Sequence, residues 1–427
     1  MPGIEVEVTA GPVDLGGSWN ELVGRAAPNV FMDPAGLNAV PAKAFARTHV
    51  FTAWDRSTSE NRLVGVWALE EKRVARFGPR YLSAPPHAYS FVGSPVVEPA
   101  VADEVMRAFL EAIAKHRALP KTLRLKYLDG GASTHASLMR ALAARKTYGP
   151  VPSERTRPFA SKDGGVKRSG STRKKLRQDW NRLSALGAAD YVNERSSDAV
   201  ALAFEAFLQL EFASWKGEAG SALLCRDKDA AFTRAFIAGL AAEGKASVAL
   251  LRLDGKPIAA QVLLYCGRFA YTWKIAFDAG FGKYSPGAVL VDKVTEELFA
   301  GEVDAIESCS PEGGFMTQMW DGRRKTVDLL VSLAGRPSLA LAAVMTRDRV
   351  HAALKQTRNR IRAIEWAPDG AALPRLAGNL RLVLVALVSG FWLLAEPADQ
   401  RPNLESGTPQ DRRLLDEALG TRPGDGR

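Results

Sequence analysis

Glycines, charged residues and aromatic residues that could form a ligand site are concentrated between Trp273 and Ser308. Here the chain is expected to leave a strand, cross a glycine-rich loop and enter a helix. A helix start offers unpaired amides and a positive dipole end, and Gly280, Gly282 and Gly287 allow a ligand close to the backbone. Lys283 adds a positive charge. The pattern predicts an anion-binding loop, although a merely flexible loop before a proline-started helix fits the same residues.

Apolar runs around this loop predict the strands and the helix that hold it in place. They form a β-β-β-α-β unit with four strands and one helix: Ala246–Leu253, Ile258–Tyr265, Phe269–Ala276, Val303–Ser308 and the helix Pro286–Ala300. The first two strands flank Asp254-Gly255, a tight-turn dipeptide. Apolar residues on both faces of the first strand indicate a sheet covered on both sides.

A similar order of elements occurs in the first 150 residues. The predicted elements are two hairpin strands, a helix and a further strand: Thr48–Trp54, Leu63–Leu69, Ala102–Arg117 and Thr122–Tyr127. We therefore expect an α/β (α+β) fold with two tandem halves, each a mixed central sheet flanked by helices.

The expected domain organisation follows from shifts in composition. The two halves are assigned to residues 1–150 and 171–335, joined by a linker at 151–170 that is rich in Pro, Gly, Ser and basic residues. A helical extension is expected at 336–396 and a disordered, polar tail at 397–427. Within the extension, Leu382–Ala395 has no charge but is shorter than the ~20 residues of a membrane span. This segment is a buried helix, an interfacial segment or a membrane span, and the sequence leaves these three interpretations open.

The charge balance indicates an anionic partner. The 427 residues include 57 Lys and Arg against 47 Asp and Glu, which gives a formal net charge of +10. The clearest basic segment runs from Arg173 to Arg182 around the apolar line Leu176, Trp180 and Leu183. It is either a solvated helix face over a buried stripe or an anion-binding surface. Hydrophobic residues at 46% exclude a fibrous or wholly disordered chain.

Several chemistries lack the residues they need. Three cysteines and five histidines show no metal-ligand spacing, and neither a Gly-x-Ser-x-Gly elbow nor a His-Glu-x-x-His site occurs. The segment Gly239–Lys245 has P-loop spacing but ends a helix instead of following a strand. The acidic, short N-terminus lacks the features of a secretory signal, and the few cysteines suit a reducing cytosol.

Certain motifs carry a family resemblance. The segments Ala213–Gly217 and Asp254–Ala260, Lys274 with Tyr284–Gly287, and the Trp320-x-x-x-Arg324 stretch resemble GNAT-superfamily acyltransferases of the CelD type, associated with cellulose biosynthesis. The basic helix that starts at Arg173 resembles them too. The similarity spans residues 18–335 and is strongest from 170 to 330. Such proteins are similar to Fem-type aminoacyltransferases, which also contain two GNAT-like halves.

The resemblance implies acyl transfer from a thioester to an amine. In GNAT folds two parallel strands splay apart around the donor, and here these strands would be Phe269–Ala276 and Val303–Ser308. Four catalytic candidates follow: Glu307 as the base, Tyr284 as the proton donor to the leaving thiolate, and Lys274 and Asp278 orienting the acceptor. A structural salt bridge is the alternative role for Glu307. The donor, acyl-CoA (acetyl-CoA), would meet six residues: Gly280, Gly282, Lys283, Ser285, Gly287 and Ala288.

The donor loop departs from the family pattern. The stretch Phe281–Gly287 lacks the (Arg/Gln)-x-x-Gly-x-(Gly/Ala) signature, so an acyl carrier protein or aminoacyl-tRNA bound at Arg173–Arg182 is an alternative to CoA. Three functions are therefore open. The leading one is a cytoplasmic N-acyltransferase acting on a small amine or amino sugar for envelope polysaccharide. The others are a Fem-like tRNA-dependent ligase, and a non-catalytic scaffold that contacts the inner membrane face through its C-terminal extension.

Overall fold

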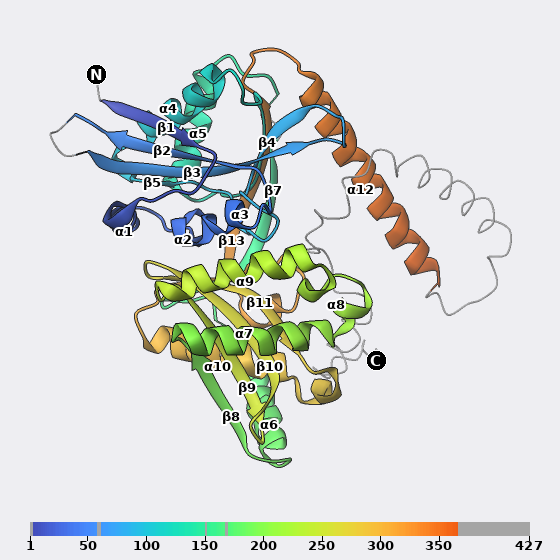
Figure 1. The fold of residues 1–427 in the computed structure, drawn as a ribbon. Coiled ribbons are helices and arrows are strands. Elements are labelled where there is room, and N and C mark those ends of the chain that lie inside the picture. Colours follow the sequence, from blue (N-terminus) through green and yellow to red (C-terminus); the bar gives the residue numbers. More distant parts are fainter. Residues whose placement is uncertain (1–2, 58–60, 150–151, 167–169, 366–427) are drawn as a thin grey trace.

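The computed structural model describes residues 3–57, 61–149, 152–166 and 170–365, and its strands form one continuous mixed sheet (Figure 1). The N-terminal half contributes β1 (Ile4–Thr9), β2 (Thr48–Asp55), β3 (Arg62–Arg73), β4 (Arg80–Ala84), β5 (Val96–Val97) and β6 (Thr122–Asp129). The C-terminal half contributes β8 (Ala189–Glu194), β9 (Ala246–Leu253), β10 (Lys256–Cys266), β11 (Phe269–Phe277) and β12 (Ala305–Glu307). Two long strands join them, β7 (Ser153–Ser161) and β13 (Arg323–Ser332).

The joining strands are exchanged between the halves. The sheet order is β1-β2-β3-β4-β6-β13-β7-β12-β11-β10-β9-β8, with β5 paired to β3. Thus β13, at the end of the C-terminal half, lies beside β6, and β7, which follows the N-terminal half, lies beside β12. The exchange makes the two halves one hydrogen-bonded unit.

The expected linker at 151–170 is corrected by β7. The prediction was wrong for Ser153–Ser161 because charged residues at the exposed start of this strand hide its apolar alternation. Only from Arg157 onward do buried positions dominate. A strand that pairs on both sides with distant segments has little local signature, since its stability comes from its neighbours in the sheet.

Helices cover both faces of the C-terminal part of the sheet (Figure 1). On one face lie α7 (Ser197–Phe212) and α9 (Asp227–Ala242), and on the other α6 (Gly170–Ser184) and α10 (Pro286–Ala300). The N-terminal half carries α1 (Gly16–Arg25), α2 (Pro34–Leu37), α3 (Ala39–Ala42), α4 (Ala102–Lys115) and α5 (Ser133–Ala143). Short elements complete the chain: α8 (Trp215–Glu218), α11 (Met316–Met319), η1 (Val30–Met32), η2 (Pro99–Val101), η3 (Leu223–Cys225) and η4 (Ala279–Tyr284). The α/β fold of two tandem halves is confirmed.

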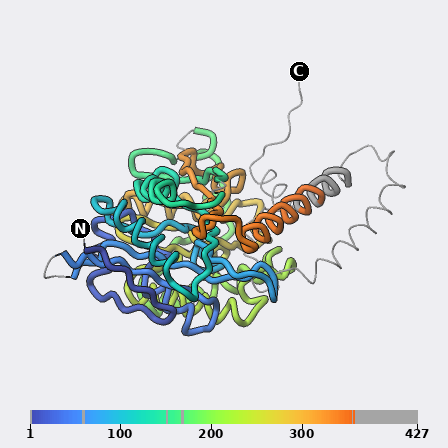
Figure 2. Tube along the Cα trace, turned by 90° about the horizontal axis from the view of Figure 1, so that it is seen from above, coloured from blue at the N-terminus to red at the C-terminus, as the bar shows by residue number. Residues whose placement is uncertain are grey.

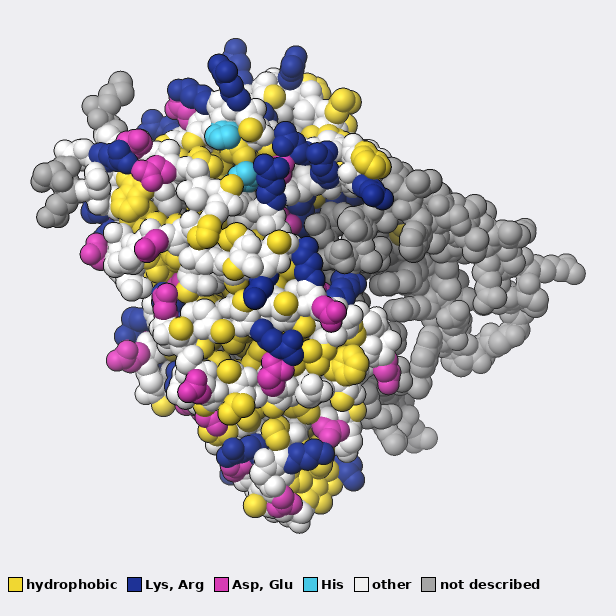
Figure 3. All heavy atoms as spheres, viewed as in Figure 1, with side chains coloured by type: hydrophobic (Ala, Val, Ile, Leu, Met, Phe, Trp, Pro, Cys, Tyr) yellow, Lys and Arg dark blue, Asp and Glu magenta, His cyan; other side chains and the backbone are white. Residues whose placement is uncertain are grey.

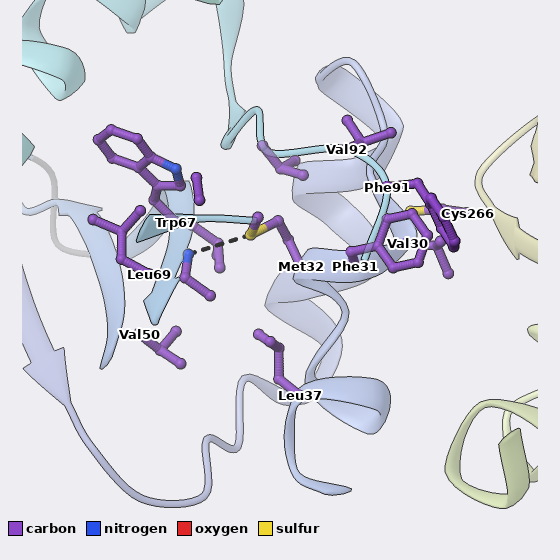
Figure 4. Close-up of a cluster of buried hydrophobic side chains, with 14 of the residues drawn as sticks. Val30, Phe31, Met32, Leu37, Val50, Trp67, Leu69, Phe91, Val92 and Cys266 are labelled. Carbon is purple, nitrogen blue, oxygen red and sulfur yellow. Dashed lines mark hydrogen bonds between the residues drawn. The ribbon is translucent and has the colours of Figure 1, made fainter. Parts of the chain in front are cut away.

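One hydrophobic core is continuous between the halves. Figure 4 shows Phe31 and Phe91 of the N-terminal half beside Cys266 of β10, with Met32 and Trp67 farther into the same cluster. This core extends under α7 and α9, whereas α6 and α10 pack on a separate cluster across the sheet. Because the first core belongs to both halves, the halves cannot separate without exposing it to water.

The last described helix, α12 (Leu339–Glu365), extends away from the body (Figures 1 and 2). Its first turns pack Leu341 and Val344 on Tyr81. Within the described residues, no helix combines the length and apolar character needed to cross a bilayer. The segment Leu382–Ala395 and the tail at 397–427 lie outside the described residues.

The positive charge is unevenly distributed over the face seen in Figure 3. Lys and Arg side chains gather at the upper end, over the N-terminal half. Lower down, around α7 and α9, basic and acidic side chains alternate. The pairing of Arg234 with Glu205 is one example of this alternation.

Candidate active site

Strands β11 and β12 form a fork. They are parallel and pair over three residues each, Phe269–Tyr271 with Ala305–Glu307. Beyond Tyr271, no strand of the described chain pairs with β11 on that side. The Thr272 hydroxyl donates to the carbonyl of Ser308 at 2.9 Å, and the two chains then diverge. The separation leaves an open backbone edge on β11, which can donate to a developing oxyanion.

A β-bulge lies at the point where the fork opens. On the side of β10, Leu263 pairs with Thr272 and Val262 pairs with Lys274, so Trp273 is the extra residue. The bulge breaks the alternation of side chains, because Trp273 and Lys274 both turn toward α7 and α9. The Trp273 ring lies 5.7 Å from that of Phe236 on α9.

The donor loop connects the open edge to α10. Asp278 caps η4, since its Oδ1 accepts from the amide of Gly280 at 2.9 Å. Ser285 adopts a left-handed conformation with φ of 49° directly before Pro286. The amide of Ala288 donates to the Ser285 carbonyl, so Ala288 contributes a small buried side chain and no free amide.

Gly287 lies where the start of α10 faces the end of β11. A Cβ atom there would lie 3.3 Å from Cδ1 of Phe277 and 3.7 Å from Cδ1 of Ile275. Glycine therefore preserves the space between helix start and strand. Gly282 has no heavy atom within 4 Å of an added Cβ, so its side faces open space.

Cations surround the same helix start. The Tyr284 ring has the Arg182 guanidinium and the Lys283 ammonium each 5.0 Å from its centroid. Arg182 belongs to α6, whose apolar residues Leu176 and Leu183 are buried against the sheet. The buried apolar stripe of the basic helix is therefore confirmed. Arg182 brings positive charge close to the loop before α10, and anion binding by this helix stays a prediction.

Lys274 forms a buried ion cluster with α7. Its Nζ lies 3.2 Å from Oε1 of Glu211, and Lys216 Nζ lies 3.2 Å from the same oxygen. Burial opposes the charge of Glu211, but the two ammonium groups and the Leu223 amide outweigh it and lower its pKa to about 2. Burial lowers the pKa of Lys274. The cluster ties α7 to the open edge, where Lys216 Nζ also donates to the Ile275 carbonyl.

Glu307 belongs to a buried row of charges across four neighbouring strands. Its carboxylate lies 3.4 Å from Nη1 of Arg324 on β13 and 3.9 Å from Nη1 of Arg157 on β7. Arg324 and Arg157 are direct cross-strand partners, and Arg324 also pairs with Asp129 at the end of β6. Two guanidinium groups placed opposite each other need carboxylates beside them. Glu307 therefore supplies a counter-charge that holds the exchanged strands together.

A pocket of about 350 Å³ opens beside this row. Its wall includes Tyr127 of β6, Arg155 and Arg157 of β7, and Cys309, which is two residues beyond the last paired residue of β12. Burial, reinforced by Glu307, raises the pKa of the Cys309 thiol. The thiol thus stays protonated, which makes it a poor nucleophile. Among the described residues, no group of three or more His, Cys, Asp or Glu is arranged to hold a metal ion.

The N-terminal half forms one wall of the fork. Trp273 Nε1 donates to the carbonyl of Tyr89 at 2.9 Å, and the Tyr271 hydroxyl donates to the carbonyl of Pro28 at 2.9 Å. Arg157 donates to the carbonyl of Phe91. The segment around Tyr89 and Phe91 therefore runs from the bulge to the pocket.

The predicted site residues fall into separate groups. The donor-loop residues and Tyr284 lie together at the start of α10, whereas Glu307 lies in the charge row and Lys274 turns to Glu211. Asp278 is engaged in capping its own turn. The sequence-based prediction missed three charged residues at the site: Arg155, Arg157 and Glu211. Glu211 lies two residues before the motif Ala213–Gly217 and could have been found there.

Residues 170–311 match the family model of the acetyltransferase (GNAT) domain. The comparison with curated proteins gave no match. The fold is similar to FemX, with 12% identity, 75% of this chain and 96% of that chain covered, and a TM-score of 0.50.

Two further structures are similar at lower scores. L-PGS from Bacillus licheniformis shows 14% identity over 81% of this chain and 98% of that chain, with a TM-score of 0.45. A tandem GNAT protein from the clavulanic acid biosynthesis pathway shows 13% identity over 78% of this chain and 100% of that chain, with a TM-score of 0.39. Similarity at these identities concerns the fold. The family match locates a GNAT-type acetyltransferase domain at residues 170–311, within the second of the two tandem α/β halves, and supports a transferase.

Proposed function

We propose that the protein is an N-acyltransferase that moves an acyl group, acetyl in the simplest case, from acyl-CoA to an amine of a small molecule or amino sugar. The observation that carries this proposal is the fork between β11 and β12, with a bulge at its opening and a cationic helix start facing it. This arrangement suits a thioester whose carbonyl meets the open edge and whose phosphates meet the donor loop.

In the proposed reaction the acceptor amine attacks the thioester carbonyl. The carbon–nitrogen bond forms, the carbon–sulfur bond breaks, and the CoA thiolate leaves. One backbone donor on the open edge of β11 would stabilise the oxyanion by roughly 3 kcal/mol. The amine must lose a proton to a base, and the thiolate gains one, for which Tyr284 at the helix start is the candidate donor.

The chemical identity of the acyl donor distinguishes this function from that of a Fem-like aminoacyl-tRNA-dependent ligase. Lys174 and Arg177 are exposed on α6, and neither forms an ion pair within the described chain. Such a surface suits a long polyanion as well as the phosphates of CoA. An acyl carrier protein, which is negatively charged like CoA and tRNA, is a third candidate donor. More specifically, we propose that the protein acts in the cytoplasm in CelD-type polysaccharide synthesis.

A thermal-shift panel of acyl-CoA thioesters tests the donor. A ligand present at about 100 times its dissociation constant should stabilise the protein by about 2.7 kcal/mol. We expect acetyl-CoA or a longer acyl-CoA to raise the melting temperature and desulfo-CoA to do so without turnover. Binding to tRNA with a steep salt dependence, together with no response to any acyl-CoA, would assign the ligase function instead.

The role of Glu307 is tested by Glu307→Gln. If Glu307 is the base, turnover falls by a factor of about 100 or more while donor affinity is retained, and the acidic limb of the kcat/KM profile disappears. If it acts only as the counter-charge of Arg324 and Arg157, the variant loses stability and the acidic limb persists. Unchanged turnover with an unchanged pH profile would exclude Glu307 as the base.

A further inference from the structure

The pocket beside the fork is lined by two arginines of very different environment. Arg155 and Arg157 are two residues apart on β7, so their side chains lie on the same face of the sheet. Both line the pocket. Their ionic and hydrogen-bond partners decide which of them can serve a ligand.

Arg157 is committed to the protein. Its side chain is 7% exposed, and its guanidinium stacks on the Tyr127 ring with 4.2 Å to the centroid. It also donates to the Phe91 carbonyl and faces Glu307. These contacts hold Arg157 as a rigid part of the wall.

Arg155 is weakly engaged in comparison. Its side chain is 53% exposed, and its ion-pair partner, Asp328, lies at the 4.0 Å limit of such a contact. Only one oxygen of Asp328, Oδ2, faces Arg155, while Oδ1 accepts from the Tyr127 amide at 2.9 Å. The pocket wall therefore contains a guanidinium with donors to spare.

The acidic residue of the wall does not compensate this charge. Glu312 lines the pocket, but its carboxylate accepts from Nε of Arg323 at 2.8 Å. The hydroxyl of Thr326, also in the wall, donates to the backbone carbonyl of Arg155 at 3.4 Å. A planar guanidinium with free donors binds phosphate and carboxylate groups in a bidentate manner.

We infer that this pocket binds an anionic group of the acceptor, a phosphate or a carboxylate, through Arg155. The inference rests on the proposed function, since Cys309 and Glu307 connect the pocket wall to the end of the fork. An acceptor held by its anionic group would reach the fork with its amine. The substrate class is then an amine that also bears an acidic group, such as a phosphorylated amino sugar or an amino acid.

Calorimetry with three small probes on the full chain tests the inference. Phosphoethanolamine and β-alanine carry an amine together with a phosphate or a carboxylate, and ethanolamine carries the amine alone. We expect at least one acid to bind at least tenfold more tightly than ethanolamine, and the stronger one identifies the anionic group. Equal affinity for all three probes, or binding by neither acid, would overturn the inference.

Substitution of Arg155 provides the second measurement. Arg155→Met should weaken binding of the preferred acid at least tenfold, and Arg155→Lys should retain part of it. Arg234→Met is the matched control, because Arg234 is an exposed arginine on α9 that is paired with Glu205. An unchanged affinity in Arg155→Met would contradict the inference.

Acetyl-CoA titrations separate this inference from the proposed function. Arg155→Met should bind acetyl-CoA as the unmodified protein does. If the protein binds no acyl-CoA but binds phosphoethanolamine in an Arg155-dependent manner, the proposed function is contradicted and the anion site is supported. The converse result, acetyl-CoA binding without an Arg155-dependent anion, would overturn only the anion site.

Discussion

The two halves contain the same fork in different states. In the N-terminal half β4 and β6 are parallel and pair over three residues, Leu82–Ala84 with Leu123–Leu125, as β11 and β12 do in the C-terminal half. There the chain after β4 returns into the opening, and the Gly93 amide donates to the Tyr127 carbonyl at 3.1 Å. The N-terminal fork is thus filled by its own backbone, whereas no strand of the described residues closes the C-terminal fork.

The filled N-terminal fork supports the open C-terminal fork. The segment that closes the N-terminal fork also contributes the carbonyls of Tyr89 and Phe91 to the wall of the C-terminal fork. The filled fork therefore acts as a scaffold for the open one. We expect substitutions in the first to affect stability and substitutions in the second to affect ligand binding.

The largest expected effect is on the filled fork. A Cβ atom on Gly93 would lie 2.1 Å from the carbonyl oxygen of Lys126, a backbone atom that cannot move alone. Gly93→Ala should lower the free energy of unfolding by about 3 kcal/mol. Gly282→Ala, in the open loop, should change it by less than about 0.5 kcal/mol. Urea denaturation midpoints measure both, and equal midpoints would show that the N-terminal fork is not tightly filled.

The next effect concerns the seam between the filled fork and α9. His87 is 1% exposed, lies against Phe232 and Phe236, and neither ring nitrogen has a hydrogen-bond partner among the described residues. Burial and, to a smaller extent, Lys72 lower the pKa of His87 from 6.5 to about 3. The unfolded chain therefore takes up the proton more readily, and stability is lost as pH falls below 6.5.

At pH 5.0 this loss amounts to about 2 kcal/mol. His87→Leu should remove that part of the pH dependence, as seen in unfolding curves at pH 7.5 and 5.0. The exposed His116 offers the control variant His116→Gln, which should keep the full dependence. Identical pH dependence in His87→Leu and the unmodified protein would show that His87 does not cause the loss of stability at low pH.

The smallest expected effect is on the open fork. Ser285→Glu places a carboxylate at the start of α10, where the donor phosphates are proposed to bind, and should weaken acyl-CoA binding roughly tenfold through like-charge repulsion. Val101→Glu places the same group at the start of α4 and should leave acyl-CoA affinity unchanged. Calorimetry compares the two variants. Equal weakening by both would remove the distinction between the halves.

The sequence predicted the C-terminal unit closely. The helix at Pro286–Ala300 has the predicted bounds, and the strand predicted at Phe269–Ala276 ends one residue later, at Phe277. These elements have regular apolar periods, which depend on local residues alone. The donor loop follows from the same local pattern, because glycines and a proline mark its turns.

The partners of the site residues could not be predicted in the same way. Glu307 faces Arg324 and Arg157, and the latter lies in a segment that composition assigns to a linker. Lys274, the candidate for orienting the acceptor, is turned by the bulge to Glu211 on α7, a partner that the sequence pattern does not indicate. A bulge and a strand exchange depend on pairing between segments that are far apart in the chain.

Local periodicity and turn residues were enough to predict the β-β-β-α-β unit at 246–308, the tandem α/β halves and the glycine-bearing start of α10. Only the tertiary structure decided which fork is open, which strands are exchanged and which arginine retains free donors. Filling a fork, neutralising a guanidinium or burying an imidazole requires contacts between segments that are far apart in the sequence. These contacts form only when the sheet is assembled, so local sequence patterns do not reveal them.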